Sequence, residues 1–286
     1  MDRDSGDGKP SEGDGQGSAG RSRPVARETA SDKGGRRPRR ARALVLAALA
    51  VLGASLLANV YLARSWIASI RRAHVARLDP AELGTYAADR AKQPPAGPVL
   101  LFFGDSRSLM WPAPDGVAPY VVVNRGIGYQ TTAQIALRID ADVVPLHPAV
   151  VVFEAGVNDL KTIADVPERR AAIVAECEAN LRRIVERLRA TGATVVVVGI
   201  FDIGDVPAWR TPFWSDDVAA AVREVNAYLP TLARDGVVFL EVAPVLDDDR
   251  GKVKPAYQLD HLHLLRSGYL ALDEKLVPLV RSLPRP

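Results

Sequence analysis

The hydrophobic pattern of the chain begins with a run of 21 residues, 43–63, that contains no charged side chain. At a rise of about 1.5 Å per residue, a helix of this length spans the roughly 30 Å of a bilayer's hydrocarbon core. Tyr61 and Trp66 lie at the end of the run, where aromatic side chains meet the membrane surface. The pattern predicts a single transmembrane helix.

From residue 99 onward, short apolar runs alternate with longer stretches of helical periodicity. The apolar runs, typical of strands buried on both faces of a parallel sheet, are 99–103, 120–123, 150–153, 194–200 and 237–242. Helices are expected at about 131–140, 167–191, 214–234 and 265–282. The alternation predicts an α/β fold: a three-layer α/β/α sandwich with a doubly wound, mostly parallel five-stranded sheet of the flavodoxin-like type.

Composition divides the chain into four segments. Residues 1–42 are rich in Gly, Ser, Asp and Arg and nearly free of large apolar side chains, which predicts a disordered basic tail. Residues 43–63 form the predicted anchor. Residues 64–97 read as a helical stem followed by a loop rich in Pro and Ala, and residues 98–286 form the predicted catalytic domain.

The positive charge of the chain lies in the tail. Residues 1–42 hold 11 Lys and Arg against 7 Asp and Glu, whereas the remainder holds 26 against 27. The globular part therefore has no composition typical of a nucleic-acid surface. Six basic residues at 33–42 precede the apolar run, which predicts a cytoplasmic N-terminus and a domain outside the cytoplasmic membrane of a bacterium. A cleaved secretory signal is the alternative, although its apolar region is usually shorter.

Polar residues that suit acyl-transfer chemistry follow three of the apolar runs. They are Gly104-Asp105-Ser106-Arg107, Asn124-Arg125-Gly126-Ile127-Gly128 and Gly156-Val157-Asn158-Asp159. Catalytic residues of doubly wound sheets collect at the carboxyl ends of the strands, so these three segments are expected to meet. A fourth segment, Asp260-His261-Leu262-His263, precedes the last expected helix.

A serine hydroxyl needs a base before it becomes a useful nucleophile. A carboxylate three residues before an imidazole on a turn, as in Asp260 and His263, can hold one ring nitrogen and leave the other for Ser106. The Asn158 amide can donate to a developing oxyanion, and Gly126 permits close approach of the backbone. Taken singly, each residue also fits a helix cap, a turn or a surface position.

The remaining candidate chemistry is sparse. Cys177 is the only cysteine and cannot form an intramolecular disulfide; its amphipathic surroundings favour a structural thiol. No Cys and His cluster has the spacing of a zinc site, so neither a metal nor another cofactor is expected.

Together the four segments resemble the SGNH, or GDSL-type, hydrolase superfamily, over about residues 99–281. The resemblance implies that Ser106 is the nucleophile, His263 the base and Asp260 its partner, with Asp105 in a supporting role. It also implies that the Ser106 amide and the Asn158 side chain belong to the oxyanion hole.

The second block departs from the family pattern. Where the family often reads N-x-G-I-x-G-D-T, this chain places Tyr129 at the later glycine and Gln130 at the aspartate. The remaining oxyanion donor is then the amide of Gly128 or of Tyr129, with Gly126 supporting the loop.

The resemblance implies an esterase or lipase that hydrolyses carboxylic esters by acyl transfer. Location outside the membrane favours acyl or acetyl esters of envelope glycans or lipids as substrates. The aromatic residues of loops after the strands are expected either to line the substrate pocket or to anchor those loops: Trp111, Trp209, Phe213 and Trp214. Two alternatives are an O-acyltransferase with the same triad and a non-catalytic envelope-binding module in which Tyr129 fills the oxyanion hole.

Overall fold

The structure is a computed structural model that describes residues 36–284. The chain divides into two units, with the boundary between Ile67 and Ala68. Most of the predicted disordered tail lies outside the described residues. Residues 36–42, which were assigned to that tail, instead form the first turns of a helix. Arginine is a good helix former, so the basic residues there can extend the apolar helix that follows.

The first described helix, α1 (Arg36–Leu78), has 43 residues. From Arg39 onward it is long and apolar enough to cross a membrane, and no residue of its most apolar window is buried in the protein. Leu44 and Leu57, for example, are 71% and 72% exposed. These apolar side chains are therefore not part of a protein core.

The second unit is built on a five-stranded sheet. Its strands are β1 (Val99–Gly104), β2 (Val121–Gly126), β3 (Val150–Glu154), β4 (Thr194–Val198) and β5 (Val237–Leu240). They lie in the order β2-β1-β3-β4-β5, and every neighbouring pair is parallel. This is the flavodoxin-like order, so the predicted fold class is confirmed.

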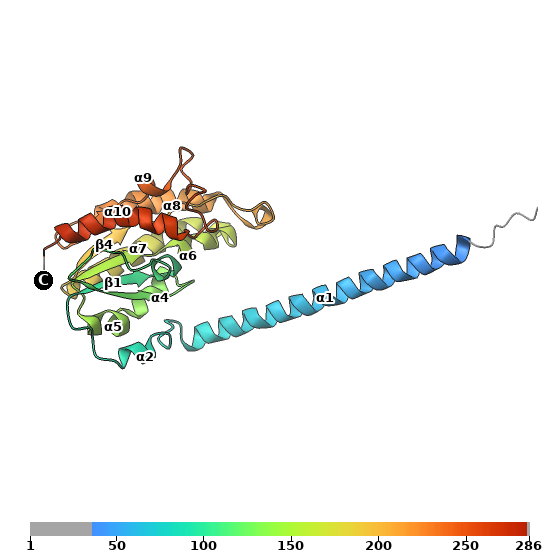
Figure 1. Ribbon diagram of the computed structural model, residues 1–286, viewed down its shortest axis with the longest axis horizontal. Helices are drawn as coiled ribbons and strands as arrows, with labels where there is room; N and C mark the ends of the chain where they lie inside the picture. The colour runs from blue at the N-terminus through green and yellow to red at the C-terminus, as the bar shows by residue number, and fades with distance from the viewer. Residues whose placement is uncertain (1–35, 285–286) are drawn as a thin grey trace, which may run out of the picture. The chain divides into compact units, whose positions relative to one another are not determined.

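Helices cover both faces of the sheet (Figure 1). One face packs against α4 (Thr132–Leu137), α5 (Ile139–Asp142), α7 (Arg170–Ala190) and α8 (Asp217–Tyr228). The other face packs against α9 (Ala243–Leu246) and α10 (Arg266–Ser282). Alternate residues of β1 enter the two cores: Leu101 and Phe103 point to the first, Leu100 and Phe102 to the second. Since both faces are buried, the strands read as continuous apolar runs.

Short elements complete the fold. The remaining α-helical turns are α2 (Ala87–Arg90), α3 (Ser106–Leu109) and α6 (Val157–Leu160). The 3-10 turns are η1 (Val144–Leu146), η2 (Lys161–Ala164), η3 (Pro167–Arg169), η4 (Thr211–Phe213) and η5 (Leu229–Leu232). Both α3 and α6 begin within three residues of a strand end, which places their first residues at the carboxyl edge of the sheet.

The strand β2 extends further than its apolar run predicts. Asn124 and Arg125 are polar, yet they pair with Phe102 and Phe103 of β1. A polar side chain does not end a strand when the backbone ladder continues, and the ladder here continues to the pair Gly104 and Gly126. The ends of β1 and β2 are therefore level, which brings the loops that follow them together.

The segment before β1 packs on the loop that follows β2. The Tyr86 hydroxyl donates a hydrogen bond to the Gly126 carbonyl, and the Gln130 side-chain amide donates to the Ala81 carbonyl at 3.0 Å. Arg90 pairs with the buried Asp142 at 2.6 Å. The second half of the segment assigned to a stem and linker is thus attached to the α/β unit at the edge where the candidate site lies.

Candidate active site

Ser106 and His263, far apart in sequence, meet at the carboxyl edge of the sheet. Ser106 is the first residue of α3, directly after β1, and its Oγ lies 2.9 Å from Nε2 of His263. The other ring nitrogen, Nδ1, lies 2.9 Å from Oδ2 of Asp260 and 3.0 Å from Oδ1. The order of contacts is hydroxyl, imidazole, carboxylate, which is the arrangement of a nucleophile, a base and the group that orients the base.

Asp260 also organises its own turn. Its Oδ1 accepts hydrogen bonds from the backbone N–H of Leu262 at 2.7 Å and of His263 at 2.8 Å. Partial burial acts to raise the pKa of Asp260, but the hydrogen bonds from His263 and Leu262 outweigh it and leave that pKa below its usual range. The carboxylate can only accept, so Nδ1 of His263 carries the proton and Nε2 presents its lone pair to Ser106.

The side chain of Asp105 caps the N-terminus of α3, the helical turn that begins with Ser106. Asp105, which is fully buried, accepts a hydrogen bond from the Arg107 backbone N–H at 2.9 Å. Gly126 lies against this turn, since a Cβ built on it would approach the Leu109 nitrogen to 2.2 Å. A side chain at Gly126 would displace the turn, which explains why the loop after β2 needs glycine at this position.

Arg107 links the turn that carries Ser106 to the turn that carries His263. The sequence did not indicate this role. Its side chain is fully buried, and its Nε donates to the Leu262 carbonyl at 2.9 Å. Its guanidinium carbon lies 4.9 Å from the ring centre of Phe201. The residue after Ser106 is therefore bonded to the residue before His263, beside the contact between Ser106 and His263 themselves.

Two buried carboxyl groups share the space behind Arg107. Glu154 lies 3.6 Å from the guanidinium and is fully buried with Asp105. Burial raises the pKa of both carboxyls, and the nearby Asp105 charge raises that of Glu154 further, well above its usual value. The pKa of Glu154 is thus shifted further upward than burial alone would shift it, and the charge of Arg107 opposes the upward shift of both carboxyl groups.

The Tyr129 side chain does not occupy the space beside Ser106. Its backbone is in the left-handed region, with φ of 66°, and its ring is 84% exposed. The neighbouring Gly128 lies next to Ser106, because a Cβ built on it would be 3.8 Å from Cβ of Ser106. The loop therefore keeps a glycine-like conformation at Tyr129 and sends the ring into solvent.

Gln130 has a structural reason to replace the family's aspartate. Its Oε1 accepts from Nε of Arg138 at 2.6 Å, while its Nε2 donates to the Ala81 carbonyl. A carboxylate could accept the first bond but could not donate the second. Arg138, a fully buried residue that sequence reasoning missed, also donates to the carbonyl oxygens of Gly104 and Arg125. It thereby ties the ends of β1 and β2 to the loop.

Asn158 lies in α6, at the end of β3, and is buried. Its Nδ2 donates to the Gln130 carbonyl at 3.1 Å, and its Oδ1 accepts from Nζ of Lys161 at 2.6 Å. The adjacent Asp159 accepts from both the backbone N–H and the hydroxyl of Thr132, at 2.8 and 2.6 Å. Burial raises the pKa of Asp159 to about 6. Through these bonds, Asn158 and Asp159 after β3 hold Gln130 and Thr132, which follow β2, in place.

The aromatic residues expected near the pocket have different surroundings. Trp111 is 2% exposed, packs with Phe102 and Tyr269, and donates its indole N–H to Asp273 at 2.8 Å. It is a core anchor covered by α10, which is the second of the two roles expected for it, and it does not line the pocket. Trp209 and Phe213 are 72% and 77% exposed.

His261 does not join the hydroxyl, imidazole and carboxylate contacts. It is buried and meets the Trp214 ring edge to face, with centroids 4.8 Å apart. Its carbonyl accepts a hydrogen bond from the Gly204 N–H.

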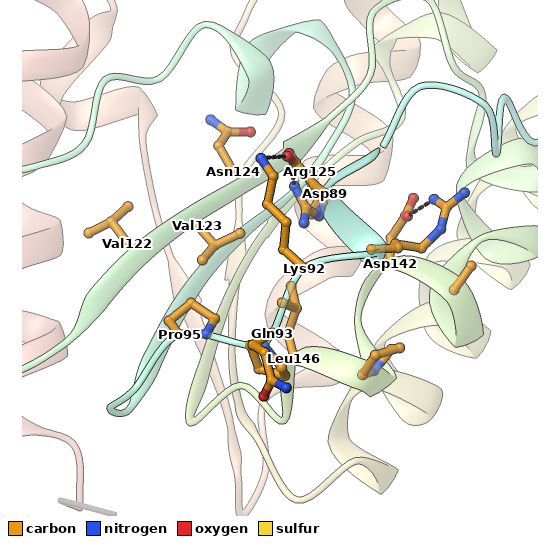
Figure 2. Close-up of a pocket in the computed structure, with 14 residues that line it drawn as sticks. Asp89, Lys92, Gln93, Pro95, Val122, Val123, Asn124, Arg125, Asp142 and Leu146 are labelled. Carbon is orange, nitrogen blue, oxygen red and sulfur yellow. Dashed lines mark hydrogen bonds and ion pairs between the residues drawn. The ribbon is translucent and has the colours of Figure 1, made fainter. Parts of the chain in front are cut away.

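A cavity of about 440 Å³ lies beside β2 rather than at Ser106. Figure 2 shows its lining side chains, which come from the segment before β1, from β2 and from α5 and η1; among them are Asp89, Lys92, Asn124, Arg125 and Asp142. Neither Ser106 nor His263 lines it. The side chains of His263 and Asp260 are 24% and 47% exposed, so the candidate site is itself open to solvent.

The other candidate chemistry is limited. Cys177 is buried, and burial raises the pKa of its thiol well above the usual value, as expected for a structural thiol. Within residues 36–284, no group of three or more His, Cys, Asp and Glu side chains is arranged to hold a metal ion.

The fold and these contacts define a class, the α/β hydrolytic enzymes with a serine at the end of β1. Residues 102–271 match the model of the GDSL-like lipase/acylhydrolase family, so the chain belongs to this family of hydrolases that act on ester bonds. No curated protein matches the chain in sequence.

Solved structures share the fold. A GDSL-like lipase from Bacteroides thetaiotaomicron is 23% identical, with a TM-score of 0.58, over 70% of this chain and 98% of that chain. An acetyl xylan esterase is 19% identical, with a TM-score of 0.52, over 63% and 98%. An acetylxylan esterase from Geobacillus stearothermophilus, solved as a catalytic mutant, is 18% identical, with a TM-score of 0.51, over 66% and 96%.

Proposed function

We propose that the protein is a serine esterase whose triad is Ser106, His263 and Asp260. The observation that carries the proposal is the continuous series of contacts from Ser106 Oγ to His263 Nε2 and from His263 Nδ1 to Asp260. In the first step Nε2 takes the hydroxyl proton as Oγ attacks the ester carbonyl, and the resulting imidazolium returns it to the departing alcohol. Water, activated in the same way, then releases the acyl group from Ser106.

The oxyanion of each tetrahedral intermediate needs donors on the side opposite the base. Three groups support this role: the Ser106 amide, an amide at Gly128 or Tyr129, and the Asn158 side chain. Gly128 lies against Ser106, and the exposed Tyr129 ring leaves the space beside the nucleophile open. Removal of one such donor typically lowers kcat by roughly 10²–10³.

The substrate class we propose is acyl or acetyl esters of envelope glycans or lipids. The half-exposed Asp260 and the partly exposed His263 describe an open site that a polymeric alcohol could approach. Two proteins of similar fold are acetylxylan esterases, whose named substrate is the acetylated glycan xylan. The exposed Trp209 and Phe213 could stack on a sugar ring, since aromatic faces suit such contacts.

We also propose that α1 anchors the enzyme in the cytoplasmic membrane, with the N-terminus in the cytoplasm and the catalytic domain outside. The support is the length and apolar composition of the helix and the basic residues at 33–42. Mass spectrometry of the mature N-terminus is the direct check, because a start after residue 63 would mean a cleaved signal.

The esterase assignment is tested with the full chain in detergent micelles. Wild type should hydrolyse p-nitrophenyl acetate, butyrate and octanoate, while Ser106→Ala should lose turnover and keep the wild-type Tm. A residual rate in Ser106→Ala close to that of wild type would exclude Ser106 as the nucleophile. An inactive wild type that acylates an added glycan from the same ester would indicate a transferase.

A further inference from the structure

Lys161 lies one helical turn after Asn158, at the start of η2. Its Nζ donates to Oδ1 of Asn158 at 2.6 Å and lies 5.1 Å from the ring centre of Tyr129. Within residues 36–284, no carboxylate forms an ion pair with this ammonium. The charge of Lys161 is therefore directed at an amide and an aromatic ring, both of which belong to the segments around Ser106.

The chemistry of the ammonium fixes how Asn158 is oriented. A lysine ammonium has three donors and no acceptor, so it can bond only to the oxygen of the Asn158 carboxamide. The nitrogen of that carboxamide must then face the opposite side, where it donates to the Gln130 carbonyl at 3.1 Å. Nδ2 carries two hydrogens, so one of them is left for a second acceptor.

We infer that Lys161 is a positioning residue of the esterase, which holds the Asn158 carboxamide with its N–H toward the oxyanion. The inference rests on the proposed function, in which Asn158 is an oxyanion donor. A hydrogen bond to the carbonyl oxygen of an amide also polarises the amide and strengthens its N–H as a donor. Lys161 thus acts through Asn158, without touching the substrate.

Tyr129, which stands where the family pattern has glycine, also contacts Lys161. The left-handed backbone at Tyr129 turns its ring away from Ser106, and the face of the ring meets the ammonium of Lys161. A cation over an aromatic face is attracted to it. Nζ is therefore held from two sides, by the ring of Tyr129 and by Oδ1 of Asn158, and the tyrosine stabilises a cation that glycine could not hold.

Loss of the ammonium would remove the donor that holds Oδ1 and leave the carboxamide oriented through its bond to the Gln130 carbonyl, so that rotation by 180° becomes less costly. The rotated form presents Oδ1 to the oxyanion and replaces an attraction with a repulsion. Since a misplaced donor can cost as much as a missing one, Lys161→Met should lower kcat about tenfold, somewhat less than complete removal of the donor. KM should stay within about twofold of wild type, because the ground-state ester carries no full negative charge.

The test is a double-mutant cycle on the full chain in detergent, with p-nitrophenyl acetate as substrate and Tm measured for every variant. The variants are Lys161→Met, Lys161→Arg, Asn158→Ala and the Lys161→Met/Asn158→Ala pair. Lys275→Met, at an exposed position on α10, is the matched control. Lys161→Arg keeps a donor and should recover most of kcat, and Lys161→Met should have no further effect once Asn158 is alanine.

Each outcome decides the question. Equal kcat in Lys161→Met and wild type, or a tenfold loss that persists in the Asn158→Ala background, would overturn the inference and leave the esterase assignment standing. If Lys275→Met lowers kcat as much as Lys161→Met does, the effect comes from the loss of one positive charge at any position, and the inference is overturned. A wild type that neither turns over the ester nor reacts at Ser106 with a fluorophosphonate would overturn the proposed function, and the positioning role with it.

Discussion

Replacement of Arg107 by leucine is the sharpest test of how the site is held together. The change removes the hydrogen bond to the Leu262 carbonyl, the contact with Phe201 and the cation that balances Asp105. A charged hydrogen bond contributes about 1.5–3 kcal/mol, and breaking a buried ion pair on one side costs about 3–5 kcal/mol. We therefore expect Arg107→Leu to lower the free energy of unfolding by about 3–5 kcal/mol, which is roughly 10 °C in Tm for a unit of this size.

The same variant should alter the pH dependence of stability. Without the arginine, Asp105 is expected to join Glu154 in keeping a proton when folded, at pH values where the unfolded chain has released both. The folded state then binds more protons than the unfolded state, so the free energy of unfolding falls as pH rises above the ordinary carboxyl pKa. The raised pKa of Glu154 predicts this effect in wild type as well, and the variant should show a steeper decline between about pH 4 and pH 8.

The assay is thermal unfolding of the full chain in detergent, followed by tryptophan fluorescence between pH 4 and pH 8. Arg187→Leu is the matched control, because Arg187 pairs with Asp140 on the surface. Such exposed pairs contribute about 0–1 kcal/mol, so this control should stay close to wild type. If Arg107→Leu keeps the wild-type Tm and pH slope, the buried charge balance described here is wrong.

Two further predictions concern contacts with the start of α4 and with the end of β2. Asp159→Asn should flatten the stability profile between about pH 4 and pH 6. Burial raises the Asp159 pKa to about 6 in the folded state, so wild type loses stability as pH rises through this range; an unchanged profile by the same unfolding assay would contradict it. Tyr86→Phe should cost about 1 kcal/mol and lower kcat, because the Gly126 carbonyl loses its donor. Equal kcat and Tm in Tyr86→Phe and wild type would show that this contact does not support the site.

The parts of the fold that could be predicted from sequence are those that depend on local pattern. Strands buried on both faces leave apolar runs, and β1 and β3 were found within one residue of their predicted ends. The spacing of Asp260 and His263 describes a contact within one turn. The meeting of the segments after β1, β2 and β3 followed from the rule that functional residues collect at strand ends. The meeting of Ser106 with His263 followed from the family resemblance, because residues 260–263 do not follow a strand.

Contacts between distant buried side chains could not be predicted in this way. Arg107 and Glu154 are charged, and a charged residue carries no periodic signal that tells whether it lies in the core or on the surface. Trp111 follows a strand, as a pocket residue would, yet it packs beneath α10. Lys161 was indistinguishable from a solvated lysine, because its role depends on the orientation of an amide in a neighbouring turn.

The hydrogen bond between Ser106 and His263 spans 157 positions of the chain. A nascent polypeptide therefore carries Ser106 long before it carries His263, and α10 must still follow to cover the second core. Native contacts of such large sequence separation form late and slowly in folding. If Ser106 and His263 act together as proposed, the growing chain gains activity toward esters only after its last helix has folded.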